Sequence, residues 1–160
     1  LHDIADRATN FYMLGSLGLC SSIGFGVALS CRGRRDGKVV AIDGDGGVLM
    51  NLGGLSTIGR YAPQNLVLVI VDNGSYGSTG DQPTATSAEC DLAAVARGCR
   101  IPSVADVDDV AAFDKAFAEA LTTPGPAVIV ARTTIEKPQT SLVPLSGPEI
   151  RDRFMEAIRD

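Results

Sequence analysis

Two short apolar runs, each followed at once by a polar turn, constrain the fold of this chain most strongly. Residues 38–42 and 66–71 have the length and the apolar content of buried strands. The first leads into Gly-Asp-Gly at 44–46, and the second leads into Asp-Asn-Gly at 72–74, with 25 residues (47–71) between the two motifs. Because open α/β sheets bind ligands at the carboxyl ends of their strands, we expect both turns at the ligand-binding edge of such a sheet.

The rest of the chain alternates between helix-like and strand-like segments, judged by apolar spacing and length. We expect helices at 18–31 (a buried one), 47–61, 91–97, 108–121 and 148–158, strands at 38–42, 66–71, 100–104 and 126–132, a polar loop at 72–88 and an extended segment at 136–146. This alternation predicts one α/β domain over residues 1–160. Its core would be a single doubly wound, mostly parallel sheet with helices on both faces.

Composition narrows the class of protein further. A chain of 160 residues with 45% hydrophobic residues suits one globular domain, and its apolar runs are too short to cross a membrane. The net charge of −5 argues against a nucleic-acid partner. With one His and four Cys, none of them in a Cys-x-x-Cys pair, zinc and iron–sulfur sites are disfavoured. We expect Cys20 and Cys31 to be small buried apolar side chains in the reducing cytosol of a cytoplasmic protein.

The two turns offer hard oxygen ligands. Asp45 supplies a carboxylate and Asn73 a side-chain amide oxygen. Such ligands suit Mg²⁺, which proteins usually hold with one or two carboxylates together with the phosphates of a substrate. Glycines around Asp45 would let the backbone turn sharply and approach a bulky anion.

The spacing of the turns resembles the Gly-Asp-Gly…Asn-Asn signature of enzymes that bind thiamine diphosphate through Mg²⁺. The chain departs from this signature at Asp72, where the family has the first Asn. The resemblance implies that Asp45, Asn73 and the backbone carbonyl of Ser75 bind the metal, with two diphosphate oxygens and a water completing the octahedron. It places the cofactor against a larger set of residues, namely Gly15, Ser16, Leu17, Gly44, Asp45, Gly46, Gly47, Asn73, Ser75, Tyr76 and Gly77.

An upstream motif and a downstream loop extend the resemblance. Leu17 matches the apolar side chain that bends the cofactor in this family, and the carbonyl of Gly15 matches the acceptor of the aminopyrimidine amine. The polar loop at 78–84 could contact substrate or close over the site, or it could simply be solvated.

Segments 11–18, 72–80 and 145–150 are similar to those of sulfopyruvate and phosphonopyruvate decarboxylases, within the family of thiamine diphosphate-dependent 2-oxo acid decarboxylases. The resemblance implies conversion of an anionic 2-oxo acid to an aldehyde and CO₂. The Glu that activates the cofactor in this family lies on a separate pyrimidine-binding domain, and we find no second α/β domain here. We therefore assign no catalytic residue in this chain.

The missing Glu implies a partner. We expect a pyrimidine-binding partner subunit in a hetero-oligomer of at least α2β2, with a small anionic substrate. Two other functions stay open: a thiamine diphosphate-dependent carboligase or synthase subunit, and a non-catalytic cofactor-binding module.

Overall fold

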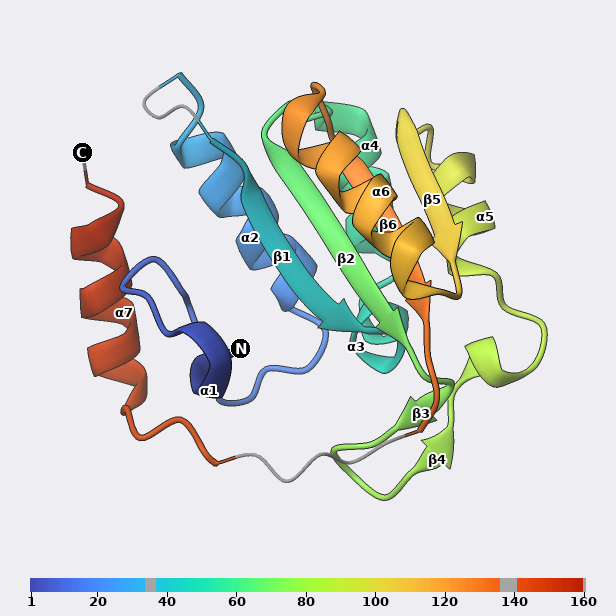
Figure 1. Cartoon of the computed structure of the whole chain (residues 1–160), viewed down its shortest axis with the longest axis horizontal. Helices are drawn as coiled ribbons and strands as arrows, with labels where there is room; N and C mark the ends of the chain where they lie inside the picture. Colours follow the sequence, from blue (N-terminus) through green and yellow to red (C-terminus); the bar gives the residue numbers. More distant parts are fainter. Residues whose placement is uncertain (34–36, 136–140, 160) are drawn as a thin grey trace. The chain divides into compact units, whose positions relative to one another are not determined.

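The structure, a computed structural model, describes residues 1–33, 37–135 and 141–159. Its contacts divide the chain into two compact units. One contains Leu1–Ser16 and Glu136–Asp160, and the other contains Leu17–Ile135. Each unit is described by itself because their relative placement is not determined (Figure 1). The single domain expected over residues 1–160 therefore stays a prediction.

Helices and strands alternate along most of the chain (Figure 1). In chain order the elements are α1 (His2–Ala5), α2 (Cys20–Ser30), β1 (Val39–Gly44), α3 (Asp45–Met50), α4 (Gly53–Tyr61), β2 (Leu66–Asp72), β3 (Ser75–Tyr76), β4 (Gln82–Pro83), the 3₁₀ turn η1 (Ala85–Ser87), α5 (Leu92–Gly98), β5 (Ser103–Val107), α6 (Val110–Thr122), β6 (Ala127–Arg132) and α7 (Gly147–Ala157).

The larger unit is built on a four-stranded parallel sheet with the strand order β1-β2-β6-β5. Helix α6 lies on one face of this sheet, while α2, α4 and α5 lie on the other (Figure 1). Strand β6 is the last in sequence, yet it pairs with β2 on one side and β5 on the other. The doubly wound, mostly parallel sheet with helices on both faces is therefore confirmed.

The core lies on both faces of the two central strands. Alternate residues of β2 enter opposite layers, so that Leu68 and Ile70 pack toward α2, α4 and α5, whereas Val67 and Val69 pack toward α6. Burying each such side chain contributes about 1.5–3 kcal/mol. Gly24 of α2 sits so close to β1 that an added Cβ would lie 2.7 Å from the Cβ of Ala41.

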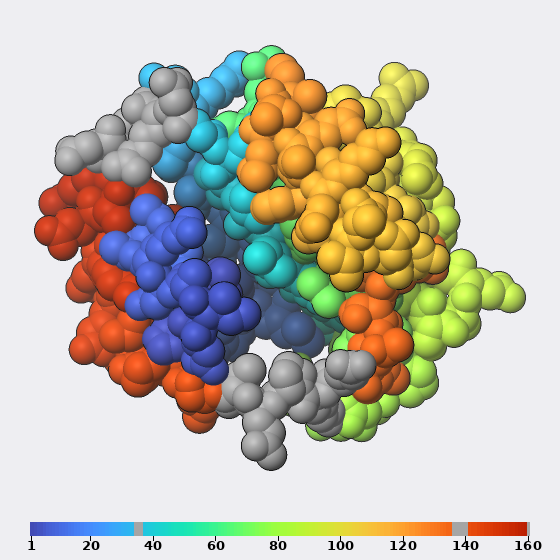
Figure 2. Space-filling model, viewed as in Figure 1, coloured from blue at the N-terminus to red at the C-terminus, as the bar shows by residue number. Residues whose placement is uncertain are grey.

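Strand β1 forms an edge of the sheet and is only partly covered. Its Val40 and Ile42 point to the face that carries α6, and they are 36% and 51% exposed. Figure 2 shows atoms of β1, in cyan, visible beside α6, in orange. The neighbouring helix α2 was expected to be buried, but Ile23 and Leu29 on its outer side are exposed. Helix α2 is packed on the sides that face the sheet and the helices α3 and α4, and its remaining side is exposed.

The helix expected at 47–61 is interrupted. The structure has two helices there, α3 and α4, separated by Asn51 and Leu52, and Asn51 has a non-helical backbone. The interruption follows from the sequence Asn-Leu-Gly-Gly at 51–54, because Asn and Gly are poor helix formers. The Asn51 amide also donates a hydrogen bond to the hydroxyl of Ser22 on α2 (3.0 Å), which holds the break in place.

The loop expected at 72–88 contains a small hairpin. Strands β3 and β4 pair antiparallel, and η1 follows them. The connecting turn is closed by backbone N–H groups of Thr79, Gly80 and Asp81, which all donate to the carbonyl of Tyr76. Strand β5 also begins three residues later than expected, at Ser103.

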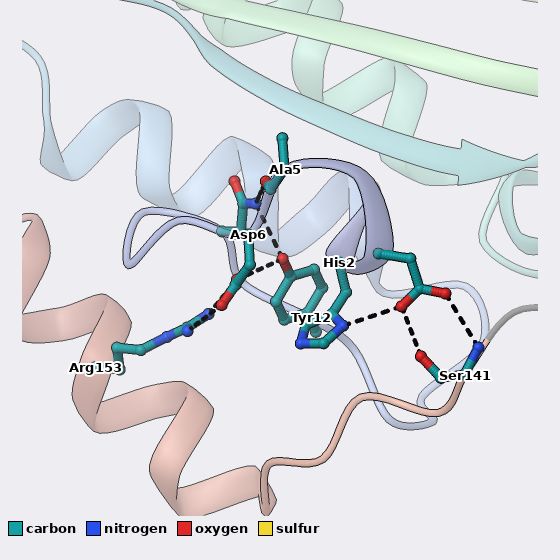
Figure 3. A network of polar contacts seen from close by, with 8 residues as sticks. His2, Ala5, Asp6, Tyr12, Ser141 and Arg153 are labelled. Carbon is teal, nitrogen blue, oxygen red and sulfur yellow. Dashed lines mark hydrogen bonds and ion pairs between the residues drawn. The ribbon is translucent and has the colours of Figure 1, made fainter.

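The smaller unit joins the N-terminal segment to helix α7 through side chains (Figure 3). Asp6 accepts two hydrogen bonds from Arg153 of α7 (2.8 and 2.9 Å) and a third from the hydroxyl of Tyr12 (2.7 Å). Nearby, Asp3 accepts hydrogen bonds from Ser141. These contacts hold the segment that ends at Ser16 against α7.

Helix α7 begins with a capping motif. The backbone N–H of Ser146 donates to the carboxylate of Glu149 (2.7 Å), and Pro148 stands in the first turn. The segment 145–150, which supported the family resemblance, therefore has a structural role as a helix start. Of the extended segment expected at 136–146, residues 136–140 lie outside the described residues.

Within the described ranges, no helix is long and apolar enough to cross a membrane.

Candidate metal-binding and cofactor site

The two polar turns follow neighbouring parallel strands. Asp45 comes directly after β1, and Asn73 comes directly after β2. The last residue of β1, Gly44, is paired with Val71, so both strands end at the same level of the sheet. Figure 1 shows α3 beginning at this edge, next to the hairpin of β3 and β4. The expectation that both turns lie at one edge of an open α/β sheet is confirmed.

Asp45 is held in the interior at the start of α3. The residue is 1% exposed. Its Oδ2 accepts a hydrogen bond from the hydroxyl of Thr84 (2.5 Å) and lies 3.0 Å from the hydroxyl of Thr86. A buried carboxylate is costly unless it is paired or binds a metal, so these two hydroxyls offset only part of its cost. A bound cation could offset the rest of this cost, and the role of Asp45 as a metal ligand stays a prediction.

The second turn presents neutral oxygens. The Oδ1 of Asn73 accepts a hydrogen bond from the backbone N–H of Ser75 (3.0 Å), which fixes the amide in an Asx turn. An amide oxygen has a second lone pair for another partner. In the β3–β4 ladder Ser75 pairs with Pro83, which has no N–H to donate to the Ser75 carbonyl. Asp45, Asn73 and Ser75 therefore have the oxygen chemistry that fits Mg²⁺.

The ligand set contains a single carboxylate. Among the described residues no group of three or more His, Cys, Asp and Glu side chains is placed to hold a metal. A site built from Asp45, an amide and a carbonyl depends on oxygens of the cofactor to complete the coordination, as Mg²⁺–phosphate sites do.

Gly46 and Gly47 allow close packing beside Asp45, while the expected contact of their backbone with a cofactor stays a prediction. Gly46 faces the ring of Tyr76, and an added Cβ would lie 2.5 Å from Cδ1 of that ring. An added Cβ at Gly47 would lie within contact distance of the Asp43 carboxylate, too close for any real side chain. Gly44 has an ordinary extended backbone (φ −87°). The space beside Gly46 and Gly47 is thus filled by protein, and these glycines permit close packing.

The upstream motif divides between the two units. Gly15 and Ser16 are the last residues of the N-terminal segment of the smaller unit, and Leu17 is the first residue of the larger unit. All three are exposed, with Leu17 at 48%, and Ser16 has a left-handed backbone (φ 62°). The structure does not place the first two relative to the turns, so their contact with a cofactor stays a prediction. Gly77 lies in the exposed part of the hairpin, and its role also stays a prediction.

Two groups beside the site have shifted pKa values. Burial raises the pKa of the Asp43 carboxyl. A hydrogen bond from the backbone N–H of Gly44 acts in the opposite direction, to lower that pKa, but is the smaller effect. Burial, together with the nearby Asp43 charge, raises the pKa of the Cys20 thiol to about 11. The thiol donates to the carbonyl of Ile42 (3.2 Å). Cys20 is therefore a neutral, unreactive thiol at physiological pH.

Three polar residues at the site make hydrogen bonds that the sequence did not indicate. From sequence, Thr84 belongs to a polar loop, Asp72 departs from the family signature, and Thr86 has no distinguishing feature. In the structure the Thr86 hydroxyl donates to Oδ1 of Asp72 (2.7 Å) and also lies beside Asp45. Thr84 and Asp45 are 39 positions apart, so no local pattern reveals the contact.

Comparison with known proteins agrees with this geometry. The family model described as "Thiamine pyrophosphate enzyme, C-terminal TPP binding domain" matches residues 3–131. The chain is 45% identical over 159 residues to the sulfopyruvate decarboxylase subunit beta of Methanocaldococcus jannaschii, covering 99% of this chain and 82% of that protein. It is 43% identical over 129 residues to the phosphonopyruvate decarboxylase of Streptomyces viridochromogenes, covering 81% of this chain and 31% of that protein.

A solved structure shares the fold. An enzyme from Mycobacterium smegmatis, described as thiamin diphosphate-dependent, superposes with a TM-score of 0.65 at 27% identity, over 76% of this chain and 23% of that one. This chain thus spans about a quarter of that larger enzyme. The family match covers both turns and the sheet edge on which they lie, and the chain therefore belongs to the thiamine pyrophosphate enzyme family, whose C-terminal TPP binding domain it contains.

Proposed function

We propose that this chain is the β-type subunit of a thiamine diphosphate- and Mg²⁺-dependent decarboxylase that converts an anionic 2-oxo acid to the aldehyde and CO₂. The substrate would be sulfopyruvate or a phosphonopyruvate-like acid. The observation that carries the proposal is the placement of a buried Asp45 and of Asn73 at the carboxyl ends of adjacent parallel strands. The names of the relatives support the reaction and the class of substrate.

In this proposal the chain's own groups hold the metal and the diphosphate. Asp45, Asn73 and the Ser75 carbonyl would hold Mg²⁺ together with the diphosphate of the cofactor. Thiamine diphosphate, when bound, would supply a nucleophilic carbon and an electron sink for the loss of CO₂ from a 2-oxo acid. The protein would contribute a fixed, water-poor position for that chemistry.

A partner subunit would complete the site. The proposal assigns the activating Glu to a pyrimidine-binding partner, with which this chain forms a hetero-oligomer of at least α2β2. The name "subunit beta" of three relatives supports an assembly of two kinds of chain. We also propose the cytoplasm as the location, where the four free cysteines would stay reduced.

Cofactor binding tests the site directly. Titration of Mg²⁺ into the full chain with saturating thiamine diphosphate, followed by calorimetry, should show binding by the unaltered chain. Asp45→Asn, which keeps the shape but removes the charge, should weaken binding by at least about tenfold. Asp108→Asn, at an exposed position far along the sequence, is the matched control and should bind normally.

Activity tests the reaction. The chain together with its co-purified partner should release CO₂ from sulfopyruvate or phosphonopyruvate in the presence of both cofactors. Release of no CO₂ from any 2-oxo acid would contradict the decarboxylase. A carbon–carbon bonded product from a mixture of 2-oxo acid and aldehyde would identify a carboligase instead.

A further inference from the structure

Two threonine hydroxyls meet on one oxygen of Asp45. The Thr84 hydroxyl lies 2.5 Å from Oδ2, and the Thr86 hydroxyl lies 3.0 Å from the same atom. Thr84 is 4% exposed and Asp45 is 1% exposed, so water does not compete for the contact between them, and Thr86 is partly buried beside it. The hydrogen bonds therefore fix the rotation of the carboxylate and engage Oδ2, leaving Oδ1 as the oxygen available to another partner.

The number of protons in this cluster is too small for its contacts. Each threonine hydroxyl has one proton to donate. The Thr86 hydroxyl lies 2.7 Å from Oδ1 of Asp72, 3.0 Å from Oδ2 of Asp45 and 2.9 Å from the Thr84 hydroxyl. Asp45 has the Thr84 hydroxyl as a donor and Asp72 has the backbone N–H of Gly74 (3.2 Å), but the two buried carboxylates share the single proton of Thr86. The negative charge of the cluster is therefore only partly compensated. A cation on the free oxygen of Asp45 would supply the missing compensation.

Thr84 also links the two turns through its backbone. Its N–H donates to the carbonyl of Gly74 in the second turn (3.0 Å). Its carbonyl accepts from the hydroxyl of Ser87 (2.7 Å) and from the N–H of the same residue (3.2 Å). The backbone of Thr84 is thus fixed to the turn that carries Asn73, while its side chain is fixed to Asp45.

We propose that Thr84 and Thr86 are positioning residues for the divalent cation of this site. Their hydroxyls hold Asp45 by Oδ2 so that Oδ1 faces the metal, and Thr84 keeps the two turns at the separation that the metal bridges. This inference rests on the proposed function, because it assumes that Asp45 binds Mg²⁺.

The test compares variants that differ by one hydroxyl. Thr84→Val has a similar shape without the hydroxyl, and Thr84→Ser keeps the hydroxyl. With thiamine diphosphate saturating, calorimetric titration of Mg²⁺ into the full chain should show about tenfold or weaker affinity for Thr84→Val and near-normal affinity for Thr84→Ser, as for residues that orient metal ligands. Thr86→Val should give a smaller loss. Thr79→Val removes an exposed hydroxyl of the same hairpin and should bind normally.

The outcomes distinguish the role of the threonines from the proposed function of the chain. Thermal unfolding without metal shows whether each variant is folded, and if Thr84→Val does not fold, Thr86→Val and Thr84→Ser decide the question. Normal Mg²⁺ affinity in folded valine variants, while the unaltered chain binds, would overturn the role of the threonines and leave the proposed function standing. Lack of Mg²⁺ binding by the unaltered chain would overturn both.

Discussion

The ring of Tyr76 occupies the space that a side chain at residue 46 would fill. Ideal Cβ placement at Gly46 puts that atom 2.5 Å from Cδ1 and 2.6 Å from Cε1 of the ring, with the Thr84 methyl 3.5 Å away. The first turn and the hairpin therefore interlock directly beside Asp45. This packing explains why residue 46 is a glycine.

Gly46→Ala should therefore destabilise the fold. The methyl group must displace the ring or the α3 backbone, which costs about 1–3 kcal/mol in the free energy of unfolding. Urea unfolding of the apo chain measures this cost. The control is Gly26→Ala in α2, where an added Cβ meets nothing within 4 Å and should stabilise the helix by up to about 1 kcal/mol. Equal stability of the two variants would show that the ring moves freely.

Asp72→Asn should stabilise the apo chain. The amide oxygen can still accept from the Thr86 hydroxyl (2.7 Å) and from the backbone N–H of Gly74 (3.2 Å), as Oδ1 of Asp72 does, so no hydrogen bond need be lost. One of two buried negative charges is also removed. We expect a gain of about 1 kcal/mol in the free energy of unfolding without Mg²⁺. A loss of stability in urea would mean that the charge of Asp72 strengthens its hydrogen bonds from Thr86 and Gly74 by more than its burial costs.

The Asp106–Arg132 pair should make stability depend on pH. Arg132 donates two hydrogen bonds of 2.8 Å to Asp106, and these lower the pKa of that carboxyl. Because the folded pKa is lowered, the contribution is present above the unfolded pKa of about 3.9 and is lost as pH falls through the folded value. Asp106→Asn should therefore lower the free energy of unfolding by at most about 1 kcal/mol at pH 7, because the pair is largely exposed. The loss should be smaller at pH 3.

Urea unfolding at both pH values measures this difference, and the cost at pH 7 should shrink in 1 M salt. Asp108→Asn, two residues further on and exposed, is the control and should show no such dependence on salt. If Asp106→Asn lowers stability equally at pH 3 and pH 7, the effect would come from lost packing and not from the lost charge.

Asp6→Asn should loosen the smaller unit alone. Asp6 accepts hydrogen bonds from Arg153 and Tyr12, so its loss weakens the contact of the N-terminal segment with α7. Hydrogen exchange followed by mass spectrometry should show faster exchange in 1–16 and 147–157, with β2 unchanged. Asp152→Asn, which breaks an exposed pair with Arg151 on the same helix, should leave these rates near normal. Unchanged exchange in Asp6→Asn would contradict this role.

The sequence revealed the parts of the site that depend on local pattern. Strand β2 is a run of apolar residues packed on both faces, and Asp45 and Asn73 are marked by the glycines beside them, so both the sheet edge and two candidate ligands could be predicted. The starts of the helices predicted at 91–97 and 108–121 lie within two residues of those observed. At both starts an Asp, Asp91 or Asp109, accepts a hydrogen bond from the backbone N–H three residues on, as N-cap residues do.

The parts that were missed depend on contacts between distant residues. The break after Met50 is favoured locally by Asn51, Gly53 and Gly54, but the contact that holds it, from Asn51 to Ser22, joins residues 29 positions apart. The hairpin of β3 and β4 is only two residues long on each side, too short to show a period. Thr86 gained its importance from Asp45, 41 positions earlier, and nothing in its own neighbourhood distinguishes it from a surface threonine.

The central place of β6 has a consequence for how the chain is made. On the ribosome, β1 and β2 emerge first and can pair with each other, but β5 has no strand beside it until β6 has been synthesised and inserted between β2 and β5. A nascent chain that ends before residue 127 would leave the edges of β2 and β5 open to other chains. Translation must therefore pass Arg132 before the sheet can close.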